Sequence, residues 1–252
     1  MRLPDRVAVI TGAGSGIGRA TATLFASEGA KVVVADVHER AGEETTDLIE
    51  SAGGRATFVR ADVTQPGDVE RMLSLALDRF GSLDVLFNNA GFAMGFTPIE
   101  QVDDALLDML VDVNIKGVFY GCRYAAPIMK AQGGGVIINM GSTAGIRPRP
   151  GLSAYNMSKG AVITLSKSLA LELAPHRIRV VALCPVATDT PMLPTFMGDV
   201  DPVEGRRRFI ETIPLGRLNT PQDLARAALW IASDDASMVT GTAFEVDGGR
   251  DV

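Results

Sequence analysis

Residues 11–18 read TGAGSGIG, and they directly follow the short, mostly apolar segment Arg6–Ile10. That segment is rich in β-branched residues, which is typical of a buried strand. After the glycines, apolar residues recur at helical spacing from Ala20 to Phe25, and Glu28-Gly29 ends the pattern. Glycines let a backbone approach a pyrophosphate, and a helix N-terminus offers free N–H groups with a partial positive charge. The order strand, glycine turn, helix therefore predicts a dinucleotide-binding loop; a merely flexible connection is the alternative.

The rest of the chain alternates short apolar runs with longer amphipathic segments. The apolar runs predict strands at Lys31–Ala35, Ala56–Arg60, Leu83–Phe87, Gly135–Met140, Arg179–Cys184 and Ala243–Val246. The amphipathic segments predict helices at Glu39–Ser51, Val69–Phe80, Val102–Lys130 (one helix or two joined), Ser153–Leu173 with Ser153 as N-cap, and Pro221–Ser233. Strands that are apolar along their whole length require a parallel sheet with helices on both faces. Ligands of such sheets bind beyond the carboxyl ends of the strands, where the strand order reverses.

Composition and charge limit what the chain can be. Of its 252 residues 46% are hydrophobic, and no Ser/Pro-rich linker, charge block or low-complexity tract divides it, so we expect a single domain over residues 1–252. The net charge of −6 and the pI near 5.0 argue against a nucleic-acid partner, which would need a basic face. Val7–Ile10 is too short for a signal sequence, and no segment approaches a membrane span. We therefore expect a soluble, cytoplasmic protein without a membrane partner.

Neither the cysteines nor the histidines form a cluster at metal-ligand spacing. Cys122 and Cys184 lie among apolar or small residues, which predicts buried, inert thiols. His38 and His176 have no nearby cluster of potential ligands and predict histidines in surface loops. The sequence therefore predicts no metal site and no disulfide framework.

Tyr155 and Lys159 lie four positions apart, on one face of a predicted helix. The ammonium group should lower the pKa of the phenol below its usual value of about 10. Such a phenol could take a proton from an alcohol, or return it to a ketone, nearer neutral pH. By itself Y-x-x-x-K more often marks an ordinary solvated helix face. Ser142 changes this interpretation, because it follows the predicted strand Gly135–Met140 and precedes Tyr155 by thirteen positions.

Several motifs in this order resemble the short-chain dehydrogenase/reductase (SDR) family over the whole chain. They are TGAGSGIG with the spacing Gly12, Gly16, Gly18, then Asn88-Asn89-Ala90-Gly91, then Ser142 with Tyr155 and Lys159, and the ending VTGTAFEVDGG. The resemblance implies a doubly wound, Rossmann-type three-layer α/β sandwich with a seven-stranded parallel sheet. It also implies reversible hydride transfer between NAD(H) and a secondary alcohol or ketone, and a homotetramer.

The resemblance also implies roles for four residues. Tyr155 is expected to act as the general base in oxidation and the acid in reduction. Lys159 would lower the pKa of Tyr155 and bind the nicotinamide ribose, while Ser142 would orient the substrate oxygen. Asn114 would distort its helix and hold a water near the lysine. Asparagine is a poor residue inside a helix, because its side chain competes for backbone hydrogen bonds, although a solvent-facing Asn114 is the simpler alternative.

The cofactor is expected to be NAD. Asp36 ends the second predicted strand, where a carboxylate can accept hydrogen bonds from the adenosine ribose and would repel the extra phosphate of NADP. Ser15 stands where NADP-using relatives often have arginine, and Val186 stands where relatives generally have glycine. The remaining cofactor contacts that the resemblance implies are Gly12, Ser15, Gly16, Ile17, Gly18, Asp62, Val63, Asn89, Ala90, Gly91, Tyr155, Lys159, Pro185, Thr188 and Thr190.

Residues 191–214 have a mixed composition without a clean period, and we expect a substrate lid at about residues 190–214. Its apolar residues, together with Phe92 and Phe96, would line a largely apolar pocket; packing onto the core is the alternative. The residues expected around the substrate are Ser142, Met94, Leu152, Val186, Met192 and Phe196.

Three alternative functions remain open at this point. An NADPH-dependent ketoreductase of the 3-oxoacyl-carrier-protein reductase type would prefer NADPH and need a basic patch at its mouth. Asp36 and Ser15 argue against it, whereas Arg147 and Arg149 leave such a patch possible. A non-catalytic NAD-binding regulator would be expected to lose some of the Ser142, Tyr155 and Lys159 set. A purely structural scaffold would need neither this set nor the glycine loop.

Overall fold

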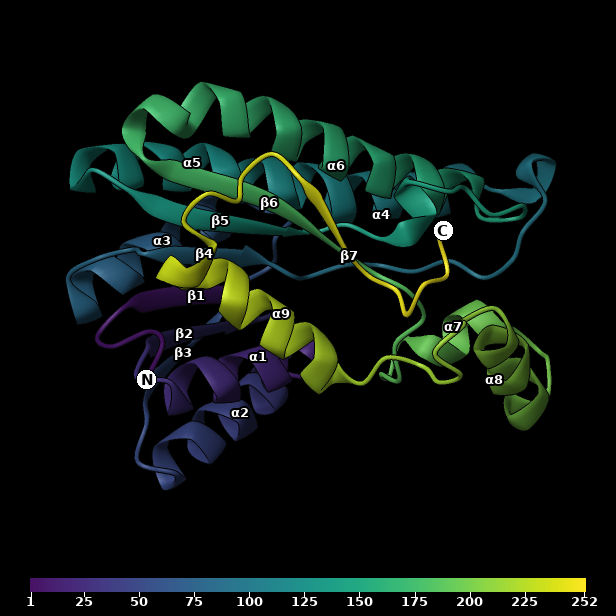
Figure 1. The fold of residues 1–252 in the computed structure, drawn as a ribbon, viewed down its shortest axis with the longest axis horizontal. Helices are drawn as coiled ribbons and strands as arrows, with labels where there is room; N and C mark the ends of the chain where they lie inside the picture. Colours follow the sequence, from purple (N-terminus) through teal and green to yellow (C-terminus); the bar gives the residue numbers. More distant parts are fainter.

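Seven parallel strands form one continuous sheet in the order β3-β2-β1-β4-β5-β6-β7 (Figure 1). The computed structural model describes all residues 1–252. The strands are β1 (Val7–Thr11), β2 (Lys31–Asp36), β3 (Arg55–Arg60), β4 (Val85–Asn88), β5 (Gly135–Met140), β6 (Ile178–Pro185) and β7 (Ala243–Val246). The chain runs outward from β1 to β3 on one side and from β4 to β7 on the other. This confirms the doubly wound, seven-stranded parallel sheet that the sequence predicts.

Helices cover both faces of the sheet (Figure 1). One face carries α1 (Gly16–Ser27), α2 (Glu39–Ser51) and α9 (Pro221–Ala232). The other carries α3 (Pro66–Phe80), α5 (Gly117–Gln132) and α6 (Ser153–Leu173), with α4 (Asp104–Leu110) beside them. The remaining helices are α7 (Leu193–Met197) and α8 (Pro202–Glu211), with short 3₁₀ turns at Ile99–Gln101, Thr143–Gly145, Ala174–His176 and Asp234–Ala236.

The alternation of side chains along the strands produces two separate cores. In β1, Ala8 and Ile10 pack with α1 and α9, whereas Val7 and Val9 pack with α3 and α5. All four are fully buried, as expected for a central strand whose successive side chains point to opposite faces. Burial on both faces explains why the strands are apolar along their whole length, which is the pattern that predicts them.

The expected helix over Val102–Lys130 is present as the second of the two forms expected, two joined helices: α4 and α5 are joined by a π-helical segment, Val111–Lys116. Two other details of the helices differ from the sequence-based expectations. Ser153 is not an N-cap: it is the first residue of α6, and Leu152 precedes the helix without a side-chain cap. The segment 191–214 forms the two helices α7 and α8, which its irregular composition did not predict.

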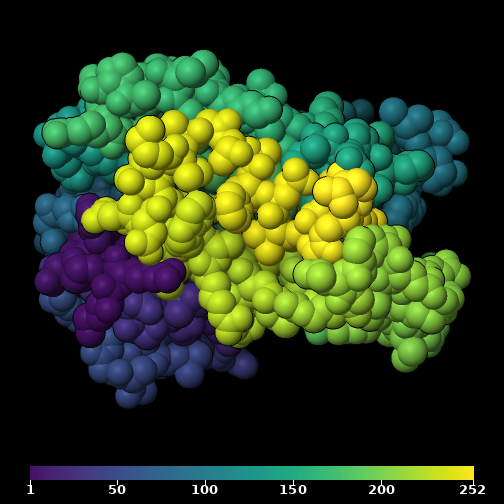
Figure 2. Space-filling view, viewed as in Figure 1, coloured from purple at the N-terminus to yellow at the C-terminus, as the bar shows by residue number.

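The helices α7 and α8 project beyond the carboxyl ends of the strands (Figure 1). The C-terminal residues lie alongside this part of the chain (Figures 1 and 2). There the backbone N–H of Leu215 donates to the carbonyl of Gly248 at 3.1 Å, and Gly249 lies against Pro214. No helix in the structure combines the length and apolar character needed to cross a membrane.

Candidate active site

A cavity of about 860 Å³ lies beyond the carboxyl ends of the strands, where residues that follow β1, β2, β4, β5 and β6 meet. The expected cofactor residues that line it are Gly12, Ser15, Gly16, Ile17, Asp36, Asp62, Val63, Asn89, Ala90, Gly91, Tyr155, Lys159, Pro185, Thr188 and Thr190. The expected substrate residues that line it are Ser142, Leu152, Val186, Met192 and Phe196. Gly18, Met94 and Asn114 do not line the cavity, and each has a structural reason.

The glycine loop has the geometry of an anion cradle. Gly12 and Gly16 have φ values of 61° and 49°, in the left-handed region that favours glycine. Ser15 precedes α1 without a side-chain cap, so the first N–H groups of the helix remain available toward the cavity. Gly18, which was expected to contact the cofactor, does not line the cavity. A Cβ there would stand 2.1 Å from the carbonyl oxygen of Gly12, so this glycine allows α1 to pack against the loop.

Asp36 lies at the end of β2 with its side chain buried and its carboxylate at the cavity wall. One oxygen accepts the backbone N–H of Gly14 at 2.8 Å, and the other accepts that of His38 at 2.9 Å. These two bonds fix the orientation of the carboxylate relative to the glycine loop. A fixed, negatively charged group at this position can accept hydroxyl donors and disfavours an additional phosphate. His38 itself is exposed, as the sequence predicts.

Ser142, Tyr155 and Lys159 meet in the same cavity. Ser142 lies just beyond β5, and its Oγ accepts the backbone N–H of Ala144 at 3.1 Å. One turn of α6 separates Tyr155 from Lys159, whose Nζ lies 5.7 Å from the centre of the tyrosine ring. The ammonium group donates to the carbonyl of Met140 at 2.9 Å. All three predicted residues are buried, so their polar groups are largely shielded from water.

The prediction that the pKa of Tyr155 lies below its usual value of about 10 is wrong for this structure. Burial raises the pKa of Tyr155 to about 12, and a hydrogen bond with Ser142 acts in the opposite direction. Burial also lowers the pKa of Lys159 to about 8. Desolvation penalises the charged form of both groups and is the largest cause of both pKa shifts. The ammonium group lies beside the tyrosine ring and is bonded to a backbone carbonyl.

Asn114 is fully buried in the π-helical segment Val111–Lys116. Its Oδ1 accepts the N–H of Phe92 at 2.7 Å, and its Nδ2 donates to the carbonyl of Phe92 at 2.9 Å and to Ser158 Oγ at 3.1 Å. The expected distortion of the helix is therefore present. Asn114 fixes the loop after β4 against α6, so it contacts the residues that frame the cavity and does not face solvent.

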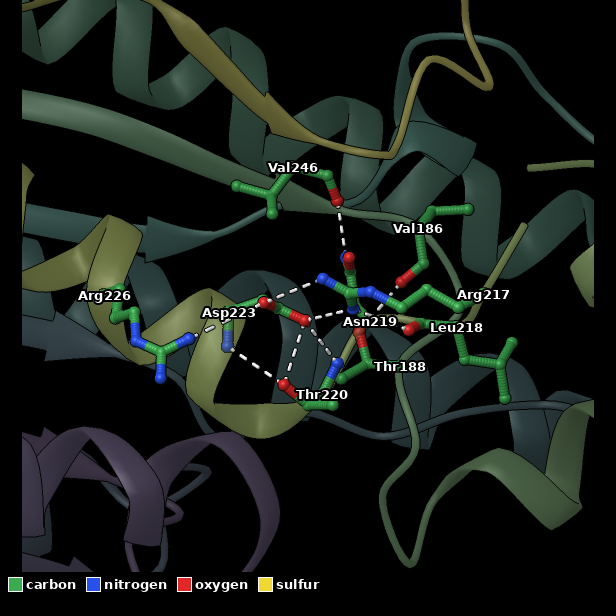
Figure 3. Close-up of polar contacts among 9 residues, drawn as sticks. All are labelled: Val186, Thr188, Arg217, Leu218, Asn219, Thr220, Asp223, Arg226 and Val246. Carbon is green, nitrogen blue, oxygen red and sulfur yellow. Dashed lines mark hydrogen bonds and ion pairs between the residues drawn. The ribbon is translucent and has the colours of Figure 1, made fainter. Parts of the chain in front are cut away.

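The loop after β6 is held by Asn219 (Figure 3). Asn219 forms an isolated parallel bridge with Thr188, and its Nδ2 donates to the carbonyl of Val246 at 2.6 Å. Thr188 Oγ1 donates to the carbonyl of Val186 at 2.9 Å. The adjacent start of α9 is fixed by a capping box between Thr220 and Asp223. These contacts tie the cavity wall around Val186 to both β7 and α9.

Asn219→Ala should therefore destabilise the protein by about 1–2 kcal/mol, because the partly buried carbonyl of Val246 loses its side-chain donor. The Michaelis constant for the cofactor should rise as the loop around Thr188 loosens. Urea unfolding and initial rates measure the two effects, with the exposed Gln101→Ala as the matched amide control. A variant with the stability and Michaelis constant of the wild type would show that Asn219 does not hold the loop.

The part of the cavity that the expected substrate residues line is mostly apolar. Phe196 of α7 packs edge-on against Tyr155, with ring centres 5.2 Å apart. Met94 is 1% exposed and packs in the core cluster with Leu110, Tyr155 and Leu152, so it supports the pocket wall from behind. The cavity residues that the sequence analysis did not identify include Met109, Val113, Pro150, Phe209 and Arg250. The position of Val113 could have been predicted, because it lies next to Asn114, which the resemblance places near the site. Arg250 lies beyond the last strand, and nothing in the sequence indicated that it reaches the cavity.

The chain is similar to known dehydrogenases and reductases. A family model described as enoyl-(acyl carrier protein) reductase matches residues 12–251. The 4-formylbenzenesulfonate dehydrogenase TsaC1/TsaC2 of Comamonas testosteroni is 40% identical over 252 residues, which cover 100% of both chains. The cis-4-hydroxycyclohexanecarboxylate dehydrogenase of Sinomonas cyclohexanicum is 40% identical over 245 residues, 97% of this chain and 96% of that protein.

Among solved structures, a 3-ketoacyl-(acyl-carrier-protein) reductase from Brucella melitensis complexed with NADH superposes with a TM-score of 0.93. It is 44% identical, and the match covers 99% of this chain and 100% of that one. Sequence and fold are thus similar to those of dehydrogenases and reductases over essentially the whole chain.

Proposed function

This chain belongs to the short-chain dehydrogenase/reductase family, and from that premise we propose that it catalyses reversible hydride transfer between NAD(H) and a secondary alcohol or ketone. The observation that carries the proposal is that Ser142, Tyr155 and Lys159 share one cavity with the glycine loop. We further propose that residues 1–252 act as one domain, with the segment 190–214 as the substrate lid. In this arrangement Phe196 of the lid already contacts Tyr155.

A nicotinamide dinucleotide fits the residues of this site. The uncapped N-terminus of α1 and the two left-handed glycines suit a pyrophosphate. Gly91 leaves open the space beside the lysine, because a Cβ at this position would stand 3.7 Å from Lys159 Nζ. When bound, the nicotinamide supplies or accepts the hydride, while the protein sets the position and the electrostatic surroundings. We assign the ribose nearest the nicotinamide to Lys159 and the adenosine ribose to Asp36.

The protein's own groups would move the proton. Tyr155 Oη takes a proton from the alcohol in oxidation and returns it to the oxygen in reduction. Ser142 Oγ holds the substrate oxygen and stabilises the charge that develops on it. Lys159 has a pKa of about 8 and is still largely protonated at neutral pH, so its charge favours the phenolate during the reaction. Asn114 positions the loop of Phe92, and through it the wall of the cavity.

The preference for NAD over NADP is assigned to Asp36. Asp36→Asn removes the charge and keeps an oxygen acceptor for one of the two backbone N–H groups, that of Gly14 or that of His38. We expect the ratio of kcat/KM with NAD to kcat/KM with NADP to fall at least about tenfold, because repulsion of the additional phosphate is removed. Initial rates with both cofactors measure the ratio, and the exposed Glu39→Gln is the matched charge control. An unchanged ratio in Asp36→Asn would remove this role.

A second candidate is an acyl-thioester ketoreductase of the 3-oxoacyl-carrier-protein type. It is favoured by the similarity to the Brucella melitensis reductase and by the presence of Arg149 at the cavity. NADH absorbance during incubation with secondary alcohols, ketones or acetoacetyl-CoA, and with either cofactor, separates the candidates. Absence of turnover with every substrate would leave only a non-catalytic dinucleotide-binding protein.

We also propose a homotetramer. A groove of about 320 Å³ between the π-helical segment, α5 and α6 is lined almost entirely by apolar side chains, including Phe119, Tyr120 and Leu165. Phe119 on α5 and Met157 on α6 are also 47% and 50% exposed, and a partner chain on this face would cover such apolar side chains. Sedimentation equilibrium measures the state of association, and a monomer at micromolar concentration would contradict the proposal.

A further inference from the structure

Two arginines line the cavity from segments far apart in the sequence. Arg149 lies in the turn before α6, and Arg250 follows β7 near the C-terminus. The turn of Arg149 packs against the substrate side of the cavity, because Gly151 lies against Phe96 and Leu152 belongs to the cluster of Tyr155. The C-terminal segment that carries Arg250 lies beside the α7–α8 part of the chain (Figures 1 and 2). Both arginines are thus placed where the substrate side of the cavity meets the C-terminus.

The hydrogen bonding of this cluster is incomplete, although its two arginines and two carboxylates, Asp247 and Asp251, balance in formal charge. Arg149 Nη2 pairs with Asp251 Oδ1 at 3.0 Å, and the side chain of Asp251 is 2% exposed. The guanidinium of Arg250 makes no hydrogen bond or ion pair, and its Nε is buried without a partner. The Nε of Arg149 and the Oδ2 of Asp251 are also buried without a partner. Asp247 forms no ion pair with either arginine; its oxygens accept the backbone N–H groups of Gly249 and Asp251. Asp251 therefore pairs with Arg149 alone, and Arg250 has neither carboxylate as a hydrogen-bond partner.

The unpartnered guanidinium of Arg250 costs free energy, and a bound anion would supply the partner that it lacks. A buried polar group without a partner loses its hydration without compensation. Burial lowers the pKa of the Arg250 guanidinium, and the neighbouring charge of Arg149 lowers it further, although Asp251 and Asp247 act in the opposite direction. The ion pair of Arg149 with Asp251 explains how the C-terminus is held, but it gives no role to Arg250.

We propose that Arg149 and Arg250 bind a carboxylate or sulfonate carried by the substrate, at the end remote from its reacting alcohol or carbonyl. The inference rests on the proposed function, since it names the substrate class of the same cavity. Guanidinium groups match the planar, bidentate geometry of carboxylates and the oxygens of sulfonates. The apolar walls formed by Phe96, Leu152 and Phe196 suit a hydrocarbon ring between the two polar ends.

The names of two relatives describe substrates of this kind. One oxidises 4-formylbenzenesulfonate and the other cis-4-hydroxycyclohexanecarboxylate, and both names combine a ring, a reacting group and an anionic group. These substrates belong to those proteins. For this chain they serve as chemically defined probes of the arginine pair.

Binding tests the anion site independently of turnover. Calorimetry on the NADH-saturated protein compares cyclohexanecarboxylate with the neutral cyclohexanecarboxamide. We expect the carboxylate to bind at least about tenfold more tightly, and Arg250→Gln to remove most of this difference, because charge-assisted hydrogen bonds to the anion are lost. The matched control is Arg226→Gln, a 72% exposed arginine of α9 outside the cavity. Equal binding of acid and amide, or an unchanged difference in Arg250→Gln, would overturn the proposal.

Asp251→Asn provides a second variant that does not depend on removing an arginine. It takes away the carboxylate that competes for Arg149, so cyclohexanecarboxylate should bind more tightly than in the wild type. If the cluster only held the C-terminus, this variant would bind the acid no better, and that result would contradict the anion site.

Kinetics then connects the site to substrate choice. For the wild type, kcat/KM with cis-4-hydroxycyclohexanecarboxylate should exceed that with cyclohexanol, and Arg250→Gln should reduce this ratio at least about tenfold. Carboxylate binding without turnover of either alcohol would refute the proposed dehydrogenase while leaving the anion site in place. A loss confined to acetoacetyl-CoA in Arg250→Gln would assign the arginines to a phosphate of a thioester carrier and overturn the inference.

Discussion

Tyr155→Phe is expected to bind NADH as the wild type does and to lose at least about three orders of magnitude in kcat/KM, near the upper end of what a general acid–base contributes. The substitution removes only the hydroxyl group. The ring that packs at 5.2 Å against Phe196, and the core cluster of Met94 and Leu152 around it, remain. The loss of activity should therefore come from the missing hydroxyl, which donates and accepts the proton, because the side chains that form the pocket keep their packing.

Fluorescence titration with NADH and initial rates on the same preparation separate binding from chemistry. Ser142→Ala serves as the comparison variant, because it removes the hydroxyl that lowers the pKa of Tyr155 and leaves the phenol in place. Its activity should fall less than that of Tyr155→Phe. Turnover of Tyr155→Phe within tenfold of the wild type would mean that another group transfers the proton.

Lys159→Met should reduce turnover at least about a hundredfold, because the charge that favours the phenolate and the proposed ribose contact are both lost. It should also stabilise the protein without cofactor at neutral pH. Burial lowers the pKa of Lys159 from 10.5 to about 8, which corresponds to a cost of about 3 kcal/mol when the lysine is charged. Methionine keeps a similar length and carries no such cost.

The sign of the pH dependence follows from this shift. Between pH 8 and 10.5 the unfolded lysine holds its proton while the folded one has released it, so the unfolded state binds more protons and stability rises with pH. The raised pKa values of Tyr155, Cys122 and Cys184, each about 12, act in the opposite direction at higher pH but are common to both proteins.

The stability difference between wild type and Lys159→Met isolates the contribution of the lysine. From pH 7 to pH 10 it should move in favour of the wild type by about 2–3 kcal/mol, measured by urea unfolding at each pH. A difference that stays constant over this interval would show that Lys159 titrates near its ordinary pKa, and that its burial has no energetic consequence.

Local sequence signals predict most of the fold, and they do so for a definite reason. In a parallel sheet the carboxyl ends of all strands lie at one edge, so motifs that follow strands must converge there. This is why the glycine loop, Asp36 and Ser142, which are far apart in the chain, meet in one cavity. The relative position of Tyr155 and Lys159 could also be predicted, because residues four positions apart lie on the same face of a helix.

What the sequence did not predict depends on packing between distant segments. The pKa direction of Tyr155 was wrong because desolvation is set by residues from several elements, which neighbouring residues on one helix do not reveal. Gly18 was assigned to the cofactor, but its position against the Gly12 carbonyl depends on how closely α1 approaches the loop. Arg250 lies in no motif, and only the path of the C-terminus brings it to the cavity.

The central claim is that hydride passes directly between a bound nicotinamide and the carbinol carbon while Tyr155 handles the proton. The most direct measurement uses NADH deuterated at its transferable position, a ketone that the protein reduces, and mass spectrometry of the alcohol formed. The account predicts one deuterium on the carbinol carbon with the wild type and no labelled alcohol above background with Tyr155→Phe. Alcohol formed without deuterium, or labelled alcohol formed equally by Tyr155→Phe, would contradict it.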